Sequence, residues 1–153
     1  MIVRTGVASM VSAYAITLTA TLFLTWFHRS RRNARLISPG AELGSDAWAV
    51  FAWLIPVVNL WVPRGLLLGT QRASSPGTTE KGRDDVLVNA WWLAWVGHVA
   101  IATIGRSSTS LPLLVVTQAL NITSAALAVC VVRRITSLQS SAGDSTRAVL
   151  QGT

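Results

Sequence analysis

The sequence has little charge and few acidic side chains. Only 12% of its 153 residues are Asp, Glu, Lys or Arg, whereas soluble domains have roughly 25%. The acidic residues number six, and none of them lies in a long apolar stretch. Because a proton- or cation-coupled pump normally needs a carboxylate within the membrane, the sequence argues against such a transporter.

Residues with catalytic or metal-binding chemistry are also missing. The single cysteine, Cys130, lies in an apolar run, which excludes an intramolecular disulfide and argues against a structural metal site. Glycine-rich phosphate loops and the motifs HExxH, GxSxG and SxxK do not occur in the chain. We therefore expect no catalytic residue, no metal and no cofactor, and we predict that the protein is not an enzyme.

Apolar residues, by contrast, are abundant. They make up 51% of the chain, and the mean hydropathy is +0.49, which is too apolar for a soluble domain of this size. A net charge of +7 would suggest nucleic acid in a soluble protein, but no nucleic-acid motif is present and the basic residues lie beside apolar runs. We predict an all-α integral membrane bundle whose basic residues contact anionic lipid headgroups, with no nucleic-acid partner.

Three apolar stretches are long enough to cross the bilayer as helices: residues 6–27, 86–105 and 111–132. A spanning helix needs about 20 residues, and none of these stretches contains an Asp, Glu, Lys or Arg. Only residues 106–110 separate the last two, which predicts a tight antiparallel hairpin. The first stretch is followed by HRSRRNAR, a stop-transfer pattern, so we interpret it as a retained anchor and not as a signal peptide.

A fourth apolar stretch, residues 47–69, is interrupted by two prolines. Pro56 and Pro63 each remove a backbone donor and disfavour helix in the residue before them, and Asn59 lies between them. One interpretation is a fourth spanning helix, since transmembrane helices tolerate proline. The other is a re-entrant hairpin, with short helices around 47–55 and 64–72 joined by a turn at 56–63.

The distribution of basic residues favours the re-entrant interpretation. Cytoplasmic loops collect Lys and Arg, and the cluster that follows the first span places the N-terminus outside and the C-terminus in the cytoplasm. With three spans and a re-entrant segment, only Arg4 and Arg106 of the thirteen basic residues remain outside. With four spans, most of the basic residues would be outside, which contradicts the rule.

Short polar segments flank the spans. Residues 28–46 end in a turn with a helix start at Ser45 or Asp46, and residues 70–85 are polar and rich in Ser, Thr and Gly, as in a loop. The membrane-embedded domain is predicted to cover residues 1–132. Residues 133–153 have little apolar density, so we expect a disordered, frayed tail.

The candidate site residues form three groups. The broken-helix motif comprises Pro56, Asn59, Trp61 and Pro63, and the predicted anionic-lipid contacts are Arg29, Arg31, Arg32 and Arg35. The polar residues within the spans are His98, Gln118 and Asn121, which we expect to bond across helices. His98 either binds a ligand or forms a hydrogen bond to the neighbouring helix as a neutral imidazole, and similar depth in the bilayer predicts that it lies beside Gln118.

Two motifs resemble the DUF4328 family. They are the basic linker in TWFHRSRRNARL and the pattern W-x4-W-x2-P-x2-N-L-W-x-P at residues 48–63, followed by a Trp cluster at 91–95. The matching positions are Trp26, Arg29, Arg32, Asn33, Ala34, Trp53, Pro56, Asn59, Leu60, Pro63 and Trp92. The resemblance covers roughly residues 15–132 and implies a small bacterial multi-pass membrane protein. It implies no activity.

Two functional hypotheses follow. The first is a non-enzymatic accessory or scaffold subunit in the bacterial plasma membrane, associated with a membrane protein partner or with further copies of itself. Its support is the small soluble mass and the missing catalytic residues. The alternative is a unit that binds or conducts a lipid or small molecule, built around the broken helix at residues 56–63.

Overall fold

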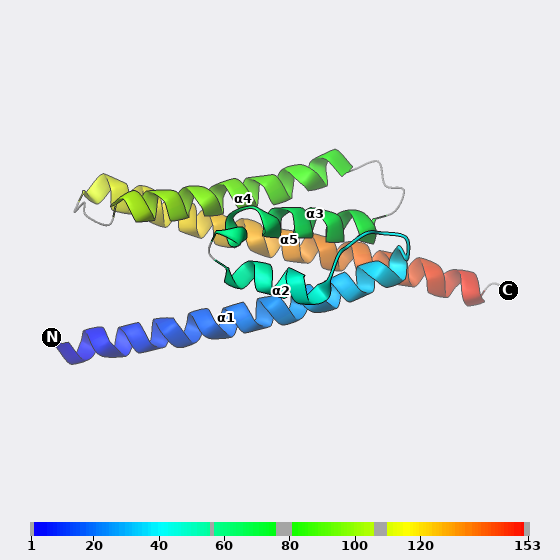
Figure 1. The fold of residues 1–153 in the computed structure, drawn as a ribbon, viewed down its shortest axis with the longest axis horizontal. Helices are drawn as coiled ribbons and strands as arrows, with labels where there is room; N and C mark the ends of the chain where they lie inside the picture. The colour runs from blue at the N-terminus through cyan, green and yellow to red at the C-terminus, as the bar shows by residue number, and fades with distance from the viewer. Residues whose placement is uncertain (1, 56, 76–80, 106–109, 152–153) are drawn as a thin grey trace.

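The computed structural model describes residues 2–55, 57–75, 81–105 and 110–151, and within these ranges all regular elements are helical. They are α1 (Ile2–Ile37), α2 (Asp46–Leu54), a 3-10 turn η1 (Val58–Leu60), α3 (Val62–Ser74), α4 (Lys81–Ile104) and α5 (Leu111–Gln151). The predicted all-α class is confirmed. Figure 1 shows α1 and α5 running in one direction and α4 in the other, with the two termini at opposite ends of the bundle.

Three helices in the described part are long and apolar enough to cross a membrane: Ser9–Ile37 in α1, Gly82–Ile104 in α4 and Leu111–Ser145 in α5. They cover almost all of the three predicted spans, and the first and last extend well beyond the predicted C-terminal ends. The basic linker after residue 27 continues α1, because Arg and Ala are good helix formers. The helix ends at Ile37 because the next residue, Ser38, precedes a proline and is disfavoured in helical conformation.

The proline-containing segment forms a helical hairpin. Ser45 caps α2, as its side chain accepts a hydrogen bond from the Trp48 amide, so the predicted helix start is confirmed. The helix ends at Leu54 since Ile55, in extended conformation, precedes proline. In Figure 1, α3 returns alongside α2, so that the start of α2 and the end of α3 point toward the same end of the bundle. Each helix is shorter than the roughly 20 residues that crossing the bilayer requires.

The core lies in the half of the bundle that contains this hairpin. Helix α3 is central, since it contacts α1, α2, α4 and α5. The buried apolar cluster draws on all five helices, with Phe27, Ala49, Leu67, Leu68, Val88, Trp91, Val131 and Ile135. By contrast, every described side chain between residues 6 and 22 of α1 is exposed. The structure therefore has a packed half and a half in which α1 is uncovered.

The predicted frayed tail is instead helical, because α5 continues to Gln151. Ile135 is fully buried in the core, and Trp26 Nε1 donates a hydrogen bond to Thr136 Oγ1 (3.2 Å). Gln139 Nε2 donates to the Ser30 carbonyl (2.8 Å) and to Ser74 Oγ (3.0 Å), which ties α5 to α1 and α3. Residues 133–139 therefore pack in the bundle. Their low content of apolar residues suggested a disordered tail, but their polar side chains form hydrogen bonds to α1 and α3.

Candidate functional site

The broken-helix motif lies at the tip of the α2–α3 hairpin. Pro56 is outside the described residues. Pro63 is buried in the first turn of α3, whereas Trp61 is exposed. The backbone N–H of Asn59 donates a hydrogen bond to the Ile55 carbonyl (2.8 Å). The side-chain Oδ1 of Asn59 is buried with no hydrogen-bond partner among the described residues.

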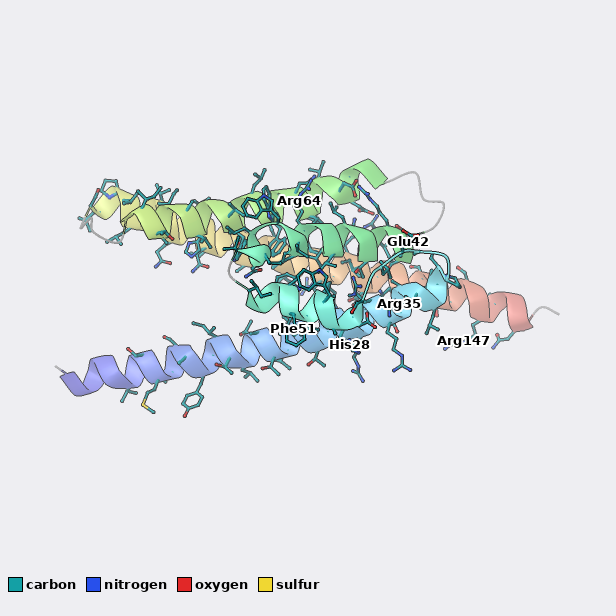
Figure 2. The ribbon with its side chains drawn as sticks, in the orientation of Figure 1. His28, Arg35, Glu42, Phe51, Arg64 and Arg147 are labelled. Carbon is teal, nitrogen blue, oxygen red and sulfur yellow. The ribbon has the colours of Figure 1, made fainter. Side chains whose placement is uncertain are left out.

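Helix α4 fixes the hairpin tip through two polar contacts. Trp92 Nε1 donates a hydrogen bond to the Leu60 carbonyl (2.7 Å), an acceptor that the interrupted helix leaves free. Arg64 Nε donates to Asn89 Oδ1 (2.6 Å), and its guanidinium lies 5.6 Å from the Trp92 ring centroid. Figure 2 labels Arg64 on the α4 side of the hairpin. Arg64 is not among the residues predicted from the sequence. The feature that could have indicated it is the spacing of Asn89 and Trp92, which lie three residues apart on one face of α4.

An aromatic cluster of Phe23, Phe27, Trp53 and Trp91 joins the hairpin to α1 and α4. The Trp53 ring lies 4.8 Å from Phe23 and 5.7 Å from Phe27, both in edge-to-face geometry. Its centroid is 6.1 Å from that of Trp91. Aromatic pairs at these separations attract each other beyond the area that they bury, so Trp53 is the main apolar anchor of α2.

Arg31 and Arg35 of α1 hold the turn that leads into α2. Arg31 donates to the Leu43 and Gly44 carbonyls and pairs with Asp46 (Nε to Oδ1, 3.4 Å). Arg35 pairs with the other oxygen of Asp46 (2.6 Å) and donates to the Gly44 carbonyl (2.5 Å). Gly44 has a φ of +67°, a conformation that glycine adopts without steric cost.

This arrangement corrects one predicted lipid contact. The Arg31 side chain is 1% exposed, so its guanidinium serves the α1–α2 turn and does not reach lipid headgroups. Arg35 is partly exposed and shared with Asp46. Arg29 and Arg32 are exposed, and neither forms an ion pair within the described ranges. Of the four predicted contacts, these two are the side chains that are free to meet headgroups.

Two ion pairs connect the start of α4 with its neighbours. Asp84 is buried, and Arg134 of α5 donates to both of its oxygens (2.9 and 3.3 Å). Arg72 of α3 pairs with Asp85 (2.5 Å), and this hydrogen bond, with the carboxylate charge, raises the pKa of Arg72 above its ordinary value. Both carboxylates therefore serve to join α4 to its neighbours.

The polar residues of the spanning helices do not converge on one site. His98 Nδ1 forms a hydrogen bond with the carbonyl of Thr117 (3.1 Å), which is one residue before Gln118. Since a carbonyl only accepts, Nδ1 is the donor, and this hydrogen bond joins α4 to α5. Gln118 and Asn121 are exposed on α5, and in the described part of the chain neither bonds to another helix, contrary to our expectation.

Two grooves lie away from the broken-helix motif. One, of about 750 Å³, is lined by uncharged residues only: Asn33, Leu36, Ile37, Ser74, Ser75, Leu138, Gln139, Ser141, Ala142, Gly143 and Ser145. The other, of about 460 Å³, lies between α4 and α5 and is lined by Arg83, Asp84, Val86, Leu87, Ala90 and Arg134. No group of His, Cys, Asp or Glu within the described residues is suited to hold a metal ion.

Comparison with known proteins gives one match. Residues 2–137 match the model of a family described as a domain of unknown function, DUF4328. The matched range contains α1 to α4 and the part of α5 that packs in the core. No curated protein and no solved structure matches the chain.

Proposed function

The chain belongs to the DUF4328 family, and we propose that this member is a non-enzymatic scaffold or accessory subunit of the bacterial plasma membrane. It uses the N-terminal segment of α1, residues 6–22, to associate with other transmembrane helices. The observation that carries the proposal is the exposure of every described side chain in this segment. The same helix is packed against α2, α3 and α5 further along.

The surface of this segment suits a helix–helix contact. Small side chains recur at every fourth position, at Ser9, Ala13, Thr17 and Thr21, and the repeat continues just beyond the segment at Thr25. The three threonine hydroxyls donate to carbonyls four residues earlier, at 2.8 to 2.9 Å, so these three donors are satisfied within α1. Small residues at this spacing let two transmembrane backbones approach closely. The van der Waals packing that results is one of the main forces that hold helices together in lipid.

The orientation that we propose has three spans, with the α2–α3 hairpin entering from the cytoplasmic side. Both ends of the hairpin lie toward the end of the bundle where α1 carries its arginine cluster and α5 ends. Residues of that end are cytoplasmic by the positive-inside rule. The N-terminal segment of α1 then lies in the outer leaflet, where a neighbouring helix can reach it.

Matched substitutions on α1 test the association. Ala13→Leu adds bulk to the small-residue face, and we expect it to weaken association about fivefold, which corresponds to about 1 kcal/mol. Ala15→Leu is the control, because residue 15 lies about 200° around the helix from residue 13. Both positions are exposed. The measurement is the amount of co-purifying polypeptide, including further copies of the chain, after mild-detergent extraction. Equal losses in both variants would contradict the proposal.

The sequence suggested an alternative function, binding or permeation of a lipid or small molecule at the broken helix of residues 56–63. The observation that favours binding of a small molecule lies at another place in the structure. The 750 Å³ groove lies where Gln139 bridges α1 and α3. Its uncharged lining combines apolar side chains with a few hydroxyl and amide groups, which suits a small neutral ligand. Native mass analysis of the same preparation distinguishes the two functions. A retained small molecule without an associated polypeptide would favour the alternative over the scaffold.

A further inference from the structure

The groove between α4 and α5 has a charged part and an apolar part. Arg83, Asp84 and Arg134 line one part, and Val86, Leu87 and Ala90 line the other. Residues 83 and 90 are about 10 Å apart along the helix axis. The stretch of α4 that is long and apolar enough to span begins at Gly82. In that span the charged part of the groove belongs to the end at the membrane surface, and the apolar part lies deeper.

The groove is lined by two arginines and one aspartate, so it has one more positive than negative side chain. Asp84 is buried and both its oxygens accept from Arg134, so these two charges compensate each other. Arg83 is exposed, and it forms no ion pair with any residue that the structure describes. A guanidinium presents a fork of donors that matches two phosphate oxygens. The headgroup that fits beside it is therefore an anion.

We propose that this groove binds one anionic phospholipid, with the headgroup phosphate on Arg83 and an acyl chain against Val86, Leu87 and Ala90. The proposal is independent of the scaffold function. It also differs from a general attraction of headgroups to the basic end of the bundle. Arg29 is equally exposed and unpaired within the described chain, but it lines neither groove. Arg83 differs from Arg29 because it lies beside a groove that can hold an acyl chain.

The test uses the full chain in lipid nanodiscs or mild detergent and counts retained lipids by native mass analysis. The probes are a phosphatidylglycerol and a phosphatidylcholine with the same acyl chains. We expect the wild-type chain to retain phosphatidylglycerol in preference. Arg83→Gln should lower this retention about tenfold, because a charge-assisted hydrogen bond is lost. Arg29→Gln, the matched control, should change it less than about twofold.

A second variant tests the apolar part of the groove. Ala90→Phe fills the space below the headgroup with all charges intact, and we expect it to lower phosphatidylglycerol retention as well. A melting measurement in detergent accompanies each variant. Arg83→Gln should melt like wild type, because the Arg83 side chain is exposed and forms no ion pair within the described residues.

Four results would overturn the proposal. They are equal losses in Arg83→Gln and Arg29→Gln, equal retention of the two lipids, unchanged retention in an Ala90→Phe variant that melts normally, and displacement of the lipid by excess inorganic phosphate. The last result would mean that the groove recognises phosphate without the acyl chain.

Discussion

Replacing Arg31 by alanine should lower the free energy of unfolding by about 3 kcal/mol, the cost of removing one partner from a buried charged network. The guanidinium is almost fully buried and donates to two carbonyls of the turn before α2. Without it, the Leu43 carbonyl loses this donor and Asp46 keeps only Arg35. Thermal or denaturant unfolding in detergent measures the effect.

The control for this experiment is Arg29→Ala, which removes the same charge two residues earlier in the same helix. Arg29 is exposed and makes no ion pair or hydrogen bond within the described chain, so its substitution should change the free energy of unfolding by less than about 0.5 kcal/mol. Similar effects of the two substitutions would mean that Arg31 contributes only through its charge and would contradict the buried contact.

The Trp53→Ala substitution should destabilise the protein by about 3 kcal/mol, as large-to-small changes of packed aromatic residues do. It removes the ring that joins α2 to Phe23, Phe27 and Trp91. The hairpin should then loosen from α1 and α4, which faster hydrogen exchange of the α2 amides would report.

Trp48→Ala is the matched control in the same helix. The Trp48 side chain is 49% exposed and makes no ring contact with the other described aromatics, so its loss should cost less than about 1 kcal/mol. If both tryptophan variants unfolded alike, Trp53 would not be the anchor of the hairpin.

Much of the fold follows from local sequence signals. Long runs without charge predict the helices that can span the membrane, because the bilayer core excludes unpaired charges. The proline at position 56 and Ser45 predict the end and start of α2, because both effects act within a few residues of the chain. The hairpin of short helices was one of the two structures expected for residues 47–69.

The burial of Arg31 could not be predicted, because it depends on distant parts of the chain. In the sequence it is one arginine among four, and the helical linker alone does not distinguish it from Arg29. Its burial requires residues 43–46 to fold back onto α1, through the left-handed conformation at Gly44. Similarly, residues 133–139 look like a polar tail, and only the positions of Asp84, Ser30 and Ser74 give them partners.

The most direct test of the account is the topology of the hairpin, measured by cysteine labelling in intact cells. The background is Cys130→Ala, and single cysteines replace Gly40, Gly82 and Ser110, which are all exposed. At both glycines an added Cβ meets no atom within 4 Å. The account predicts that an impermeant thiol reagent labels position 110 in intact cells, and positions 40 and 82 only after permeabilisation. Labelling of position 82 with protection of position 110 would contradict it, because residues 47–69 would then cross the membrane.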